Sequence, residues 1–79
     1  MASPTTVLAT FLFVSPAQLT AGLPGRDETA SLIRDAATSR SYQEALGELA
    51  YEYGAHPETA APRMAACLQA VKAARKGVR

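Results

Sequence analysis

The strongest constraint on the fold is the segment Ser41–Tyr53, which carries the start and the spacing of an amphipathic helix. Ser41 and Glu44 stand three residues apart, as in a capping box, where each side chain bonds the other residue's backbone N–H. Apolar residues then recur at helical intervals in one stripe: Tyr42, Ala45, Leu46, Leu49, Ala50 and Tyr53. Seventeen alanines in the chain also favour helix. The sequence therefore predicts an all-α fold.

Further capping residues predict four to five short helices in a compact bundle. A first helix can start at Ser3-Pro4, a short one at a second capping box over 15–18, and another after Asp27, covering 28–38. A chain of 79 residues has room for one core only, since it buries about 60–65% of its unfolded surface. We expect all 79 residues to form a single domain.

Residues 5–14 are compatible with two structures. Val7, Leu8 and Phe11 share a helical face, but the threonines, valines and phenylalanines of this segment also favour a strand. No other segment resembles a strand, so a strand here would pair with a second copy of the chain. We predict a helix, with the intermolecular strand as the alternative. The large apolar residues at 11–14 are more than we expect so small a monomer to bury, which argues for a homodimer.

Charge is distributed unevenly, although the net charge is only +1. Residues 1–25 carry no charged side chain, 41–58 carry only acidic ones and 63–79 carry only basic ones. Proteins that bind nucleic acids or anionic membranes usually have a larger basic surplus. The apolar run at 7–14 is too short to span a bilayer and is not preceded by the basic residues with which a secretory signal begins. We expect a cytoplasmic protein that does not bind membranes.

Residues 46–60 contain a spacing of small residues typical of one motif. Ala50 stands four positions before Gly54, and Pro57-Glu58-Thr59 follows. This pattern resembles the core of helix-turn-helix DNA-binding domains. The resemblance implies two helices that cross steeply, the second entering the major groove. It assigns nucleic-acid contacts to His56, Glu58, Thr59 and Arg63, supported by Lys72, Arg75 and Lys76.

Other features of this segment argue against DNA binding. A helix that starts at Pro57 contains Pro62, whose ring removes a backbone hydrogen bond at a cost of ~3 kcal/mol. A helix capped by Thr59 tolerates Pro62, but the connection from Gly54 is then too long for the family. Ala60 is smaller than the family's usual residue, and the nearby glutamates oppose phosphate contacts. We predict that Pro62 prevents a straight helix. A start at Pro57 would favour the DNA-binding domain, and a start at or after Thr59 the protein-interaction domain.

No set of residues predicts an enzyme, a cofactor or a metal site. His56 and Cys67 are the only residues of their types, and the pair gives no zinc-binding pattern. No serine stands near a base and an acid, and no glycine-rich loop could hold a phosphate. We interpret His56 as a turn residue and Cys67 as a small buried apolar residue. Because Cys67 is the only cysteine, the chain cannot form an intrachain disulfide.

Tyr51 lies away from the apolar stripe, beside the row of glutamates. An exposed tyrosine next to charged residues is a common anchor in protein interfaces. The alternatives are a ring that lies flat on its neighbours and glutamates that only keep one helix face hydrated. We predict a small non-enzymatic interaction domain (an adaptor, inhibitor or regulatory domain) that binds a protein partner through Tyr51, Glu44, Glu48 and Glu52. A helix-turn-helix transcriptional regulator is the alternative.

Overall fold

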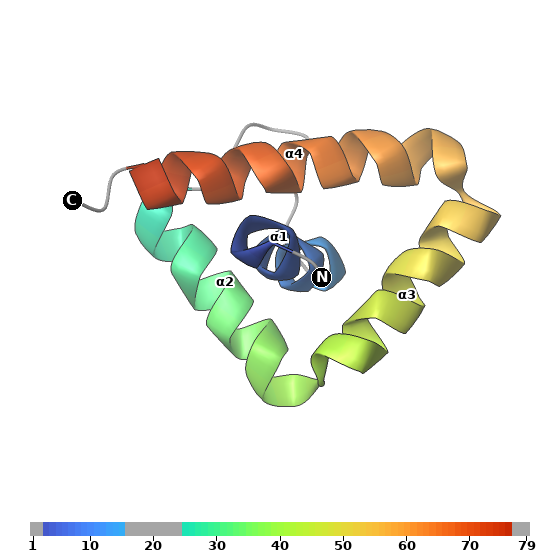
Figure 1. Cartoon of the computed structure of the whole chain (residues 1–79), viewed down its shortest axis with the longest axis horizontal. Coiled ribbons are helices and arrows are strands. Elements are labelled where there is room, and N and C mark those ends of the chain that lie inside the picture. Colours follow the sequence, from blue (N-terminus) through green and yellow to red (C-terminus); the bar gives the residue numbers. More distant parts are fainter. Residues whose placement is uncertain (1–2, 16–24, 77–79) are drawn as a thin grey trace.

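The computed structural model describes residues 3–15 and 25–76, and these ranges form four helices and no strand (Figure 1). The helices are α1 (Pro4–Val14), α2 (Arg26–Ser39), α3 (Tyr42–Ala55) and α4 (Pro57–Lys76). The predicted all-α bundle is confirmed. The short helix expected after the capping box at 15–18 lies outside the described residues.

The N-terminal segment is a helix, so the alternative of an intermolecular strand is wrong. The Ser3 side chain accepts a hydrogen bond from the Thr6 N–H at 3.2 Å, and Pro4 occupies the first turn, where its missing N–H costs nothing. At the other end, the Ser15 hydroxyl donates to the Leu12 carbonyl at 2.6 Å. Local capping thus outweighs the strand preference of the individual residues.

Helix α1 is the centre of the bundle. Figure 1 shows it nearly end-on, inside a triangle whose sides are α2, α3 and α4. Phe11, Leu12 and Phe13 are buried as a result, and Val14 is half-buried. A helix with neighbours on three sides can bury apolar residues all round, which an edge helix cannot. Burial of these residues therefore does not require a homodimer.

The main core lies between α1 and α4. Leu12 and Phe13 pack there with Met64, Cys67 and Val71. Three alanines, Ala9, Ala60 and Ala70, belong to the same cluster, and small side chains let two helices approach closely. A second, smaller cluster joins Phe11 to α2 and α3 through Ala36 and Ala45.

Helices α2 and α3 begin with different caps. Gly25 is the N-cap of α2 and has no side chain to bond the helix. The helix starts at Arg26, two residues before the expected start, so Asp27 lies inside the first turn and is not its cap. The capping box of α3 is present as predicted: the Ser41 hydroxyl accepts from the Glu44 N–H at 3.2 Å, and a Glu44 carboxylate oxygen accepts from the Ser41 N–H at 2.8 Å.

The apolar stripe of α3 is only partly covered. Ala45 is buried and Leu49 half-buried, but Leu46 and Tyr53 are 39% and 40% exposed. The packing of α3 on the bundle is therefore narrower than the stripe that its sequence predicts.

Helix α4 starts at Pro57 and continues to Lys76 without a break at Pro62, so Pro62 does not end the helix that precedes it. Pro57 stands at the first helical position, which favours proline. Pro62 leaves the Glu58 carbonyl without its helical donor, but both residues are exposed, so water can bind that carbonyl. Ala60 and Met64 are buried on either side of Pro62 and hold the helix on the core.

Candidate functional site

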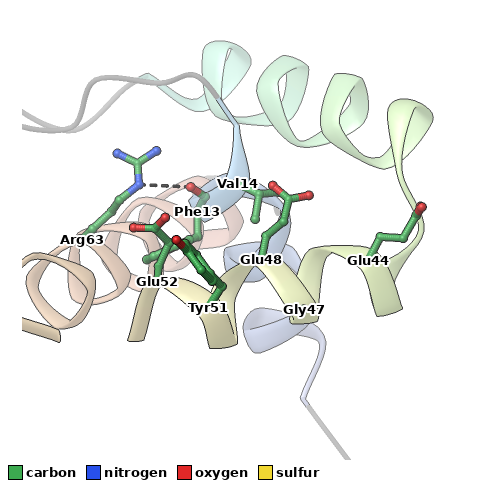
Figure 2. Close-up of a pocket in the computed structure, with 8 residues that line it drawn as sticks. All are labelled: Phe13, Val14, Glu44, Gly47, Glu48, Tyr51, Glu52 and Arg63. Carbon is green, nitrogen blue, oxygen red and sulfur yellow. Dashed lines mark hydrogen bonds between the residues drawn. The ribbon is translucent and has the colours of Figure 1, made fainter. Parts of the chain in front are cut away.

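A groove of about 720 Å³ runs along α3, beside the C-terminal end of α1 (Figure 2). We call it the α3 groove. Its lining combines an apolar part, three carboxylates and one guanidinium: Phe13, Val14, Glu44, Gly47, Glu48, Tyr51, Glu52 and Arg63. All four residues that the sequence assigns to a protein partner therefore line one groove.

Helical spacing brings the α3 residues together. Glu44, Glu48 and Glu52 follow each other at intervals of four, and Gly47 and Tyr51 form a neighbouring row at the same interval. A Cβ placed on Gly47 would meet no other atom within 4 Å. The missing side chain at position 47 therefore leaves the middle of the groove open.

Tyr51 is the most exposed large apolar residue in the described part of the chain, at 69%. This exposure favours an accessible ring over the alternative in which the ring lies flat on its neighbours. In Figure 2 it lies between Gly47 and Glu52, with Phe13 and Val14 above it in the view. The ring is accessible to a partner from the groove side.

The three carboxylates have different surroundings. A Glu44 oxygen belongs to the capping box. Both Glu48 oxygens accept from Arg40 Nη1 at 2.6 Å, in a partly exposed ion pair that contributes at most about 1 kcal/mol to folding. The Glu52 carboxylate forms no hydrogen bond or ion pair within the described residues. Among the groove's carboxylates, Glu52 has the most capacity to bind a new cation.

Arg63 closes one end of the groove. Its Nε donates to the Phe13 carbonyl and its Nη2 to the Ser15 carbonyl, both at 3.0 Å. The guanidinium also lies over the Phe13 ring, 5.4 Å from its centroid. The last carbonyls of a helix lack intrahelical partners and favour a nearby cation, so Arg63 caps α1 from another helix. The sequence assigned this side chain to DNA, and nothing in the local pattern of residues 11–15 indicates the α1 cap.

The remaining residues assigned to nucleic acid do not form one patch. His56 links α3 to α4, and Glu58 and Thr59 are exposed in the first turn of α4, where the Thr59 hydroxyl donates to the His56 carbonyl at 3.1 Å. The basic residues lie near the other end of this 20-residue helix, which is about 30 Å long. There Lys72 is exposed, Arg75 Nη1 lies 3.4 Å from the Thr5 hydroxyl and Lys76 is the last helical residue.

Cys67 is fully buried and free, as predicted. Burial raises the pKa of its thiol from 9.0 to about 11, although the nearby Arg63 charge acts in the opposite direction. The thiol is therefore protonated at neutral pH and inaccessible, which is the opposite of a catalytic cysteine. Within the described residues, no cluster of three or more His, Cys, Asp or Glu side chains could hold a metal ion.

Comparisons of the chain with protein-family models, with curated proteins and with solved structures each found no match. In the described ranges, no helix combines the length and the apolar composition that crossing a bilayer needs.

Proposed function

We propose that the chain is a non-enzymatic interaction domain, of the adaptor, inhibitor or regulatory kind, whose α3 groove binds a protein partner. The observation that carries this proposal is the placement of Tyr51, Glu44, Glu48 and Glu52 around one groove. Exposed aromatic residues beside an apolar pocket are typical anchors of protein interfaces.

The lining of the groove suggests the chemistry of the partner. The half-buried Val14 can contact an apolar side chain, and Tyr51 can cover it from the rim. Among the groove's carboxylates, Glu48 is paired with Arg40, whereas Glu52 forms no ion pair within the described residues. This free carboxylate favours a lysine or arginine on the partner. A groove of 720 Å³ is too small for a whole interface, so it would hold an anchor of a larger contact.

A comparison of variants tests the proposal. A pull-down from the native host identifies the partners, and each purified partner is then titrated against the wild type, Tyr51→Ala and Gly47→Phe. The second variant fills the groove, and Gly47→Ala is its matched control because a Cβ there meets nothing. Gln43→Ala changes an exposed residue of the same helix outside the groove.

We expect the groove variants to weaken binding by about tenfold or more, as loss of an interface anchor does, while both controls bind like the wild type. Unchanged affinity of every partner for Tyr51→Ala and Gly47→Phe would disprove the proposal.

DNA binding is the second candidate function. Its support is that α4 starts at Pro57, directly after His56, and meets α3 at a steep angle (Figure 1). Against it, the exposed residues after Thr59 include Ala61 and Pro62, which cannot donate hydrogen bonds to bases from their side chains.

Fluorescence anisotropy with a mixed-sequence duplex tests this candidate. DNA binding would be supported by an affinity for the duplex that falls steeply as the salt concentration rises. The Lys72→Gln variant should then bind the duplex more weakly than the wild type. No measurable binding at low salt would eliminate it.

A further inference from the structure

A second hollow, of about 310 Å³, lies between α2 and the C-terminal part of α4, away from the α3 groove. We call it the α2/α4 pocket. Its walls are aliphatic and come from three helices: Leu8 of α1, Ala30 and Ile33 of α2, and Val71 and Ala74 of α4. Its volume is at the lower end of the ~300–1,000 Å³ found for small-molecule sites.

Three arginines surround these apolar walls. Arg26 and Arg34 reach the pocket from α2, and Arg75 reaches it from α4. The Arg34 side chain is exposed and forms no hydrogen bond or ion pair within the described residues, and Arg75 has only the long 3.4 Å contact with Thr5. Asp27 and Glu28, the acidic residues in the first turn of α2, are not among the described residues that line the pocket.

We propose that the α2/α4 pocket binds a small organic anion with an apolar body, of the kind represented by a medium-chain carboxylate. The aliphatic walls would bury the hydrocarbon part. The planar guanidinium group matches a carboxylate with two parallel hydrogen bonds and is more weakly hydrated than an ammonium group. A neutral apolar molecule would use the walls but not the arginines, and a small inorganic anion would use the arginines but not the walls.

The proposal predicts how affinity depends on the ligand. Hexanoate, octanoate and decanoate are titrated into ¹⁵N-labelled protein below their micelle-forming concentrations, and binding is followed by NMR. Each added methylene should tighten binding by at most about fourfold until the pocket is full. Decanol should bind about fivefold or more weakly than decanoate, because it lacks the charge that pairs with the arginines. The largest shift changes should fall on Leu8, Ala30, Ile33, Val71 and Ala74.

Two variants with the same charge change separate this pocket from general attraction between opposite charges. Arg34→Gln removes a lining charge, whereas Lys72→Gln removes an exposed charge of α4 that does not line the pocket. We expect Arg34→Gln to weaken decanoate binding by about fivefold and Lys72→Gln to change it less than twofold. Ala30→Phe fills the pocket from an exposed position and should abolish binding.

Three outcomes would overturn the proposal: no saturable binding of any carboxylate, equal affinity for decanol and decanoate, or equal effects of Arg34→Gln and Lys72→Gln. Shift changes confined to residues outside the pocket would overturn it as well. Both charge variants replace exposed side chains, so their folding can be verified by circular dichroism before the titration.

Discussion

The Nε of Arg63 donates a hydrogen bond to the main-chain carbonyl of Phe13 at 3.0 Å, across 50 residues of sequence. This bond joins α4 to the last turn of α1, and the same guanidinium covers the Phe13 ring and bonds Ser15. Tyr53 stacks on Phe13 as well, with ring centroids 6.4 Å apart. Phe13 is therefore where α1, α3 and α4 meet, and it also lines the α3 groove.

Replacing Arg63 should lower the stability of the fold. We expect Arg63→Met to reduce the free energy of unfolding by about 1–3 kcal/mol, because two carbonyls at the end of α1 lose a charged donor. Arg63→Lys should recover only part of this, since an ammonium lacks the planar fork that bonds both carbonyls. Urea denaturation measures the change. Lys72→Met, at an exposed position of the same helix, is the control and should stay within 0.5 kcal/mol or so of the wild type; similar losses in both variants would contradict the capping role.

Pro62→Ala should stabilise the protein. The substitution restores an N–H that can bond the Glu58 carbonyl and removes the clash with the preceding turn, which is worth up to ~3 kcal/mol in a helix interior. Thermal denaturation measures the gain. Pro57→Ala is the matched control, because proline at the first helical position costs nothing and its removal should bring no gain. An equal effect at both positions would show that α4 does not continue through Pro62 in solution.

Cys67 should make stability depend on pH in the alkaline range. The folded chain keeps the thiol protonated up to a pKa of about 11, whereas the unfolded chain loses that proton near 9. The unfolded state therefore binds fewer protons between these values, and the free energy of unfolding falls there by at most about 1.4 kcal/mol per pH unit. This contribution is fully present below pH ~9 and lost as pH rises through ~11.

Chemical denaturation at pH 8, 9 and 10 measures this slope. The Cys67→Ala variant keeps every other ionisable group and serves as the reference, so the wild-type slope should be steeper than that of the variant. A thiol reagent should also react with the native protein only as fast as it unfolds. Rapid labelling of the native state would mean that Cys67 is not buried.

Gly47→Ala should raise stability by about 1 kcal/mol, since glycine is a poor helix former and the added methyl group meets no other atom. Thermal denaturation followed by circular dichroism measures this change in the free energy of unfolding. A loss of stability would mean that the α3 groove is narrower in solution, and the variant could then no longer serve as the control for Gly47→Phe.

Local sequence determined which segments are helical and where several of them start. Ser3 with Pro4 and Ser41 with Glu44 act on neighbouring N–H groups, so their effect is visible in a few consecutive residues. Periodic spacing also placed Glu44, Glu48 and Glu52 on one face with Tyr51 nearby. These four residues were identified from sequence because helical geometry alone brings them together.

Tertiary structure decided the rest. Pro62 has the same intrinsic cost in any sequence, but its exposed position and the buried Ala60 and Met64 on either side let α4 continue through it. The resemblance to a helix-turn-helix assigns Arg63 to DNA, and local sequence does not indicate its role as the α1 cap because its partner carbonyls lie 48 and 50 residues away. The same holds for the central position of α1 and for the arginines around the α2/α4 pocket, which depend on how helices distant in sequence pack. The physical reason is that burial and pairing are set by the sum of long-range contacts and not by neighbours along the chain.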